Sequence, residues 1–108
     1  MEKIDPPQPF LEQAGRAAAL LKALSNENRL LIMCYLAEAG EMSVGDLEAR
    51  LALSQSALSQ HLAKLRDEGL VDTRRQSQMI YYRVSDPNAV TLLTLLHDLF
   101  CPELGREA

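Results

Sequence analysis

Hydrophobic positions recur at steps of three and four residues through most of the first 70 positions, which predicts helices. Four helices are expected, over residues 10–24, 27–39, 43–51 and 55–68. Asn26, Ser43 and Ser54 stand where N-cap residues are preferred, and Gly40 and Gly69 stand where helices commonly end. Ser43 also opens a capping-box pattern, which supports the start of the short third helix.

After Gly69 the hydrophobic period changes from helical to alternating. Residues 70–75 and 79–85 are rich in Val, Thr, Ile and Tyr and flank a polar tip at 76–78, which predicts a β-hairpin. The tip contains no glycine, so its turn type stays open. Asp86 and Pro87 then start a last helix that ends near Phe100. This order predicts a mainly α fold with a β-hairpin wing, a winged helix-turn-helix.

The chain has 108 residues, which suits one domain. Its three regions are a flexible arm (1–9), a DNA-binding and dimerisation domain (10–101) and a C-terminal tail (102–108). In the last helix the apolar residues wrap more than one face, so it needs more than one neighbour. These residues are Val90, Leu92, Leu93, Leu95, Leu96, Leu99 and Phe100. They predict a homodimer that assembles through the terminal helices.

The formal net charge of −4 argues at first against nucleic acid. Residues 54–84, however, hold five basic and three acidic side chains, a net +2. A basic segment on an acidic body fits DNA binding, because local potential governs phosphate contact. The sequence has no apolar run of membrane-spanning length and no signal-peptide pattern. A cytoplasmic protein without a membrane partner is therefore expected.

The fourth predicted helix has Leu58, Leu62 and Leu65 on one face and small polar residues on the other. Small side chains let a helix approach a groove floor, and Ser and Gln can hydrogen-bond base edges. Arginines beside the hairpin tip can reach phosphate or the minor groove. The candidate DNA-binding residues are Gln55, Ser56, Ser59, Gln60, His61, Lys64, Arg74 and Arg75. The alternatives are a merely solvated helix and edge-strand charges that oppose aggregation.

Three segments closely resemble the ArsR/SmtB family of bacterial winged-helix repressors: "LKALSNENRLLIMCYL", "LSQSALSQHLAKLRDEGLVDTRR" and "IYYRVS". The likeness covers nearly the whole chain after Phe10. It implies a homodimer that binds double-stranded operator DNA with an inverted repeat and releases it when an inducer binds.

Family resemblance also allows the known sensing sites to be compared position by position. Where arsenic and cadmium sensors carry cysteines on the third helix, this chain has Ser43 and Gly45, which supply no thiolate. His97 and Asp98 lie where zinc sensors hold ligands, but the second histidine is missing. No metal site and no cofactor are therefore expected.

Cys34 in the second helix and Cys101 at the end of the last helix match the persulfide- and redox-responsive branch of this family. The resemblance implies an intrasubunit disulfide or polysulfide bridge, with reactive sulfur species as inducer. Taken alone, Cys34 is better explained as a small core residue.

Several alternatives stay open beside a redox-sensing repressor. They are a metal-responsive repressor that uses the same thiols, a ligand-independent DNA-binding regulator, and a winged helix adapted to protein contacts. A thiol enzyme with Cys34 as nucleophile is disfavoured, because neither histidine is placed by sequence near a thiol and no oxyanion-hole motif is visible. No catalytic residue is proposed. The sequence leaves open the operator, target genes, physiological inducer, bridge type, and repressor or anti-repressor role.

Overall fold

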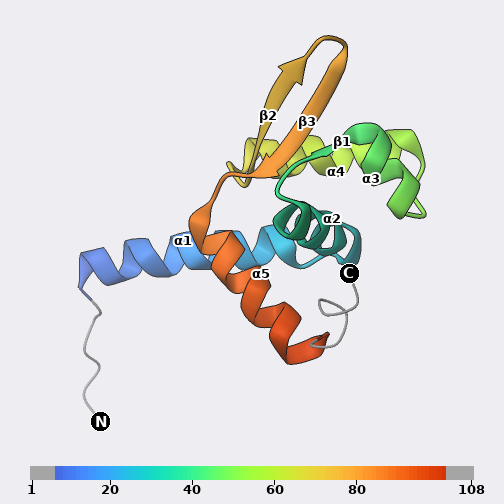
Figure 1. Ribbon diagram of the computed structural model, residues 1–108. Coiled ribbons are helices and arrows are strands. Elements are labelled where there is room, and N and C mark those ends of the chain that lie inside the picture. The colour runs from blue at the N-terminus through green and yellow to red at the C-terminus, as the bar shows by residue number, and fades with distance from the viewer. Residues whose placement is uncertain (1–6, 102–108) are drawn as a thin grey trace.

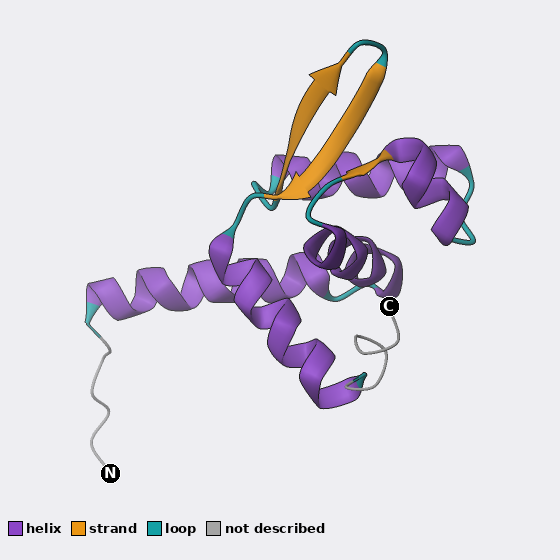
Figure 2. Ribbon diagram, viewed as in Figure 1, coloured by secondary structure: helices purple, strands orange, loops and turns teal. Residues whose placement is uncertain are grey.

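The computed structural model describes residues 7–101. The elements in chain order are α1 (Gln8–Leu24), α2 (Glu27–Ala39), β1 (Met42–Ser43), α3 (Val44–Arg50), α4 (Gln55–Asp67), β2 (Val71–Gln76), β3 (Met79–Val84) and α5 (Pro87–Phe100) (Figure 1). The predicted order of helices and hairpin is confirmed, and the fold is a winged helix-turn-helix. The hairpin projects from one side of the molecule, while α1 and α5 lie on the other (Figure 2).

Side-chain caps begin four of the helices, as the sequence predicts. The side chains of Asn26, Ser43, Ser54 and Asp86 each accept a hydrogen bond, at 2.9–3.1 Å, from a backbone N–H two or three residues later. These bonds satisfy N–H groups that have no partner within the helix. Gly40 and Gly69 follow α2 and α4 with φ of 83° and 74°, a conformation that costs glycine little.

The structure corrects two predicted boundaries and adds one strand. Helix α1 begins at Gln8, so the end of the predicted 1–9 arm is helical; proline is tolerated in a first turn because its missing N–H needs no partner there. The two-residue strand β1 was not predicted, because it is too short to show alternation. Gln76 belongs to β2 rather than to the tip. Residues 1–6 and the predicted tail, 102–108, lie outside the described residues.

The three strands form an antiparallel sheet in the order β1-β3-β2. Gln76 pairs with Met79, so the wing turn has two central residues, Ser77 and Gln78. Ser77 has φ of 56°, and no other non-glycine residue of the described chain has positive φ. Positive φ at the first central residue alone is the type II′ pattern, which matches the twist of a hairpin.

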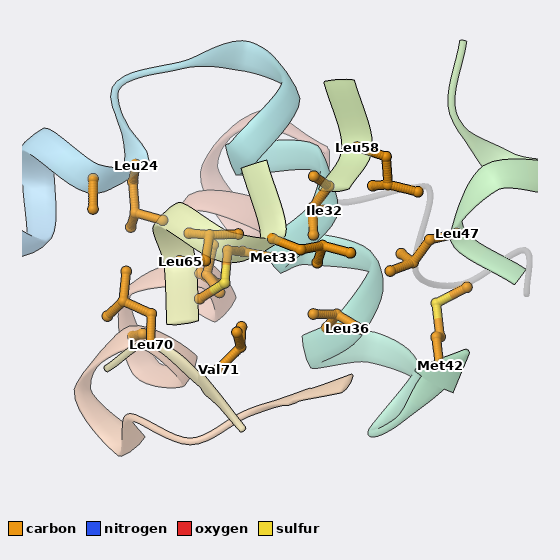
Figure 3. Packing of buried hydrophobic residues seen from close by; sticks show 14 of the residues in the cluster. Leu24, Ile32, Met33, Leu36, Met42, Leu47, Leu58, Leu65, Leu70 and Val71 are labelled. Atoms are coloured by element: carbon orange, nitrogen blue, oxygen red, sulfur yellow. The ribbon is translucent and has the colours of Figure 1, made fainter. Parts of the chain in front are cut away.

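The hydrophobic core lies where α2, α3, α4, α5 and the base of the hairpin meet (Figure 3). Leu58, Leu62 and Leu65 of α4 are buried, which confirms the predicted inner face of this helix. Ile32, Met33 and Leu36 of α2 are also buried, and they place α2 at the centre of the domain. The inner face of α4 is thereby fixed, and its opposite face is left outside.

Both terminal helices expose large apolar side chains in the single subunit. Of the 17 residues of α1, only Ala23 and Leu24 are buried. Helix α5 buries Ala89 and Leu93. The exposed apolar residues of the two helices are Phe10, Leu11 and Leu21 of α1 and Val90, Leu95, Leu99 and Phe100 of α5. The surplus apolar surface predicted from the sequence is therefore present on both terminal helices.

Candidate functional site

The outward face of α4 carries most of the predicted DNA-binding residues. Five of them, Gln55, Ser56, Ser59, Gln60 and Lys64, are exposed, and His61 is half-buried. Ser59 also lines a hollow between α4 and β3, together with Ala63 and Tyr82. Ser59 therefore lies on the flank of α4 that faces the wing.

Arg74 in the wing is held by several contacts within the protein. Its Nε and Nη2 donate to the two carboxylate oxygens of Glu41 at 3.0 and 2.6 Å, and its Nη1 donates to Gln76 Oε1 at 2.8 Å. Its guanidinium also lies 4.7 Å from the centre of the Tyr81 ring, within cation–π range. The sequence did not indicate Glu41, because nothing in its local pattern shows that it faces a strand residue far along the chain.

Arg75 points to the other face of the hairpin. It is exposed and makes no ion pair with any residue between 7 and 101. Successive side chains of a strand alternate in direction, so Arg75 shares a face with Val71 and Thr73, and Arg74 shares a face with Asp72 and Gln76. The two candidate wing arginines are thus in different states: one is paired and one is free.

Cys34 on α2 and Cys101 at the end of α5 are both half-buried free thiols. Burial raises the pKa of the Cys34 thiol above its usual value, and the nearby Cys101 thiolate and the Glu38 carboxylate raise it further. Cys34 is therefore protonated at neutral pH. The backbone N–H of Cys101 donates to His97 O at 2.7 Å, which anchors this residue to the last turn of α5.

A cavity of about 240 Å³ lies between α2 and α5 beside Cys34. It is lined by Cys34, Ala37, Glu38, Leu93, Thr94 and His97. His97 therefore lines the same cavity as Cys34, although the sequence did not place a histidine near this thiol. Residues 93, 94 and 97 share one face of α5, and only the packing of α5 on α2 brings that face to Cys34.

The described part of the chain holds no group of three or more His, Cys, Asp or Glu side chains that could bind a metal ion. His97 Nδ1 lies 3.8 Å from Asp98 Oδ1, a contact between neighbours on one helix turn. None of the helices within residues 7–101 is long and apolar enough to cross a membrane.

A helix-turn-helix with an exposed polar second helix and a basic wing defines a DNA-binding protein of the winged-helix class. Residues 26–73 match the model of the bacterial regulatory proteins of the arsR family. The chain is 49% identical to the transcriptional activator HlyU of Vibrio cholerae over 94 residues, which are 87% of this chain and 86% of that protein. It is 46% identical to the biofilm growth-associated repressor of Agrobacterium fabrum over 96 residues, 88% and 81% of the two chains.

The fold agrees with the same relationship. The structure described as reduced HlyU from Vibrio cholerae superposes on this chain with a TM-score of 0.82 and 48% sequence identity. The superposition covers 88% of this chain and 99% of the HlyU chain. The chain belongs to the ArsR family of bacterial regulatory proteins. It is a DNA-binding transcriptional regulator, which confirms the family predicted from the sequence and the prediction that it is not an enzyme.

Proposed function

We propose that this protein is a homodimeric, cytoplasmic repressor that releases an inverted-repeat operator when Cys34 and Cys101 of one subunit become bridged. The observation that carries the proposal is that the free thiol Cys34 faces α5 across a cavity lined by Thr94 and His97, one helical turn before the second free thiol, Cys101. Helix α5 also carries exposed apolar residues that suit a subunit interface. A change at Cys101 would therefore be passed to the element that sets the spacing of two DNA-binding helices.

Related proteins support a redox response and leave the direction of regulation to be measured. One solved relative is described as reduced HlyU, which names a redox state of that protein. HlyU is described as an activator and the Agrobacterium protein as a repressor. We expect the operator to be released on bridging because a bridge that displaces α5 would disturb both half-site contacts at once.

The bridging chemistry balances with an organic persulfide as oxidant. A thiolate attacks the sulfane sulfur, RSH leaves, and the second thiol displaces hydrogen sulfide to close the disulfide. Two thiols and one RSSH thus give one disulfide, RSH and H₂S. Two further RSSH molecules can instead insert two sulfur atoms and release two more RSH. A direct disulfide needs Cα atoms about 4.4–6.8 Å apart, whereas inserted sulfur relaxes that limit.

Intact mass and operator binding, measured on the same samples, test this function. We expect persulfide to give a bridged subunit, with or without added sulfur, and to lower operator affinity. Removal of zinc by a chelator should leave both readouts unchanged. If the protein bound the operator only after chelation, and its mass did not change, the result would instead favour the metal-responsive repressor that uses the same thiols. Unchanged operator affinity of a fully bridged protein would contradict the proposal.

For DNA recognition we propose that Gln55, Ser56, Ser59, Gln60, His61 and Lys64 contact the major groove and that Arg75 contacts phosphate. Replacing Gln60 with Ala should weaken operator binding by about 1–3 kcal/mol and spare nonspecific binding, because a base-edge contact is lost. Replacing Arg75 with Ala should weaken binding to all sequences and reduce the salt slope by about one unit per subunit, because each subunit loses a phosphate contact.

Binding titrations at several salt concentrations distinguish these two variants. Exposed Gln8 on α1 offers a matched control, since Gln8→Ala makes the same change far from α4. Normal operator binding by Gln60→Ala would show that this side of α4 does not read bases.

A further inference from the structure

We propose that Glu41 withholds one phosphate-binding cation from DNA in each subunit by closing an ion pair on Arg74. Arg75 is then the cation beside the wing tip that stays available to phosphate. The protein therefore binds DNA more weakly than it would if both wing arginines were available. The inference rests on the proposed role of the wing in contacting DNA.

The sheet register explains how two residues far apart in the chain meet. Arg74 on β2 pairs with Tyr81 on β3, and Tyr81 pairs with Ser43 on β1. Glu41 directly precedes β1. The Arg74 side chain therefore extends from β2 across β3, over the Tyr81 ring, and its guanidinium binds the Glu41 carboxylate beside β1.

The contacts of Arg74 occupy much of its binding capacity. A guanidinium has five N–H donors in a rigid fork, and carboxylate and phosphate both match that fork through two donors. Glu41 takes one such pair of donors and Gln76 takes a third. A phosphate that approached Arg74 would have to displace the Glu41 carboxylate to obtain bidentate contact.

The ion pair with Glu41 also cancels the charge that Arg74 would otherwise present to DNA. The hydrogen bond from Arg74 holds the pKa of Glu41 below its usual range, so the carboxylate is ionised wherever the protein binds DNA near neutral pH. The pair then presents no net charge to the DNA backbone. Both side chains remain partly exposed, at 48% for Arg74 and 33% for Glu41, so the pair can exchange partners without unfolding the wing.

A second ion pair in the hairpin provides a matched comparison. Arg83 and Asp72 face each other across β2 and β3 with Nη2 and Oδ2 3.6 Å apart, and their side chains are 61% and 56% exposed. The pair shows one long contact rather than two short ones. Asp72→Asn removes the same unit of negative charge from the hairpin as Glu41→Gln removes beside it, but it leaves Arg74 held.

The experiment measures binding to a labelled 30-base-pair duplex of mixed sequence across salt concentrations. We expect Glu41→Gln to steepen the salt slope by about 0.9 per subunit, since one phosphate contact is added. If Glu41→Gln and the wild type bind equally at 1 M salt, this difference in slope makes the affinity of Glu41→Gln at 0.1 M salt higher by up to about eightfold per subunit. Asp72→Asn should change the slope by clearly less.

The double variant Glu41→Gln/Arg74→Ala supplies an independent second test. It removes the whole ion pair, which carries no net charge and in which Arg74 is withheld, so its salt slope should match that of the wild type. A slope lower by about 0.9 per subunit in the double variant would overturn the proposal, as would equal effects of Glu41→Gln and Asp72→Asn. Failure of the wild type to bind this duplex at 50 mM salt would instead count against the proposed DNA contacts as a whole.

Discussion

Replacing Leu99 with Glu should convert the protein to a folded monomer and lower operator affinity by two to four orders of magnitude. Leu99 is 64% exposed in the single subunit, so a charge there does not disturb the subunit's own core. In the proposed dimer the same charge would be buried without a partner, which costs several kcal/mol. A monomer engages one half-site at a time and loses the gain from linked binding, about 10²–10⁴-fold.

Sedimentation and operator titration measure this result, and two variants control for it. Leu31 on α2 is 47% exposed, so Leu31→Glu makes the same substitution outside the terminal helices and should leave the dimer intact. Leu93 is 2% exposed within the subunit, so Leu93→Ala should lower the free energy of unfolding by about 2–5 kcal/mol. A Leu99→Glu protein that stays dimeric and binds the operator normally would contradict an interface built from this face of α5.

The α5 residues show what a hydrophobic pattern predicts and what it leaves undecided. The pattern correctly indicated more apolar surface than one subunit could cover. It did not separate Leu93, which packs in the subunit's core, from Leu99, which is exposed. That division depends on the angle at which α5 crosses α2, and the crossing angle is set by side chains of both helices.

Features of the candidate site that depend on neighbouring residues could be predicted from the sequence, whereas those that depend on residues far along the chain could not. Ser54 could be predicted as a cap because its hydrogen bond reaches only to Ala57. Glu41 could not be paired with Arg74 in advance, because a three-stranded sheet separates them and β1 was not predicted. His97 beside Cys34 was missed for a related reason: the sequence shows helix faces but not which faces meet.

Serine at either cysteine position should abolish the response to persulfide while leaving reduced-state DNA binding intact. Serine is close to cysteine in shape, so Cys34→Ser and Cys101→Ser should each bind the operator as the reduced wild type does. A 100-fold loss of affinity in the bridged wild type corresponds to about 2.7 kcal/mol of coupling between bridge and DNA. Neither variant can form the intrasubunit bridge, so both should lose that coupling.

The measurement is operator binding by wild type and both variants, with and without persulfide. Release of DNA by either variant as readily as by the wild type would rule out the cysteine pair as the sensor. The Gln60→Ala protein serves as a control that binds the operator less tightly but should still respond. Its response separates a weakened DNA contact from a lost switch.

The pH dependence of the reaction follows from the raised pKa of Cys34. Only the thiolate attacks sulfur, and the neutral thiol is favoured by burial, by the Cys101 thiolate and by the Glu38 carboxylate. Below that pKa, attack by Cys34 should accelerate about tenfold per pH unit and level off only above it. In Cys101→Ser the only remaining thiol is Cys34, so its alkylation rate can be measured directly across pH. A rate that levels off below pH 9 in this variant would contradict the raised pKa of Cys34, of which burial is the largest cause.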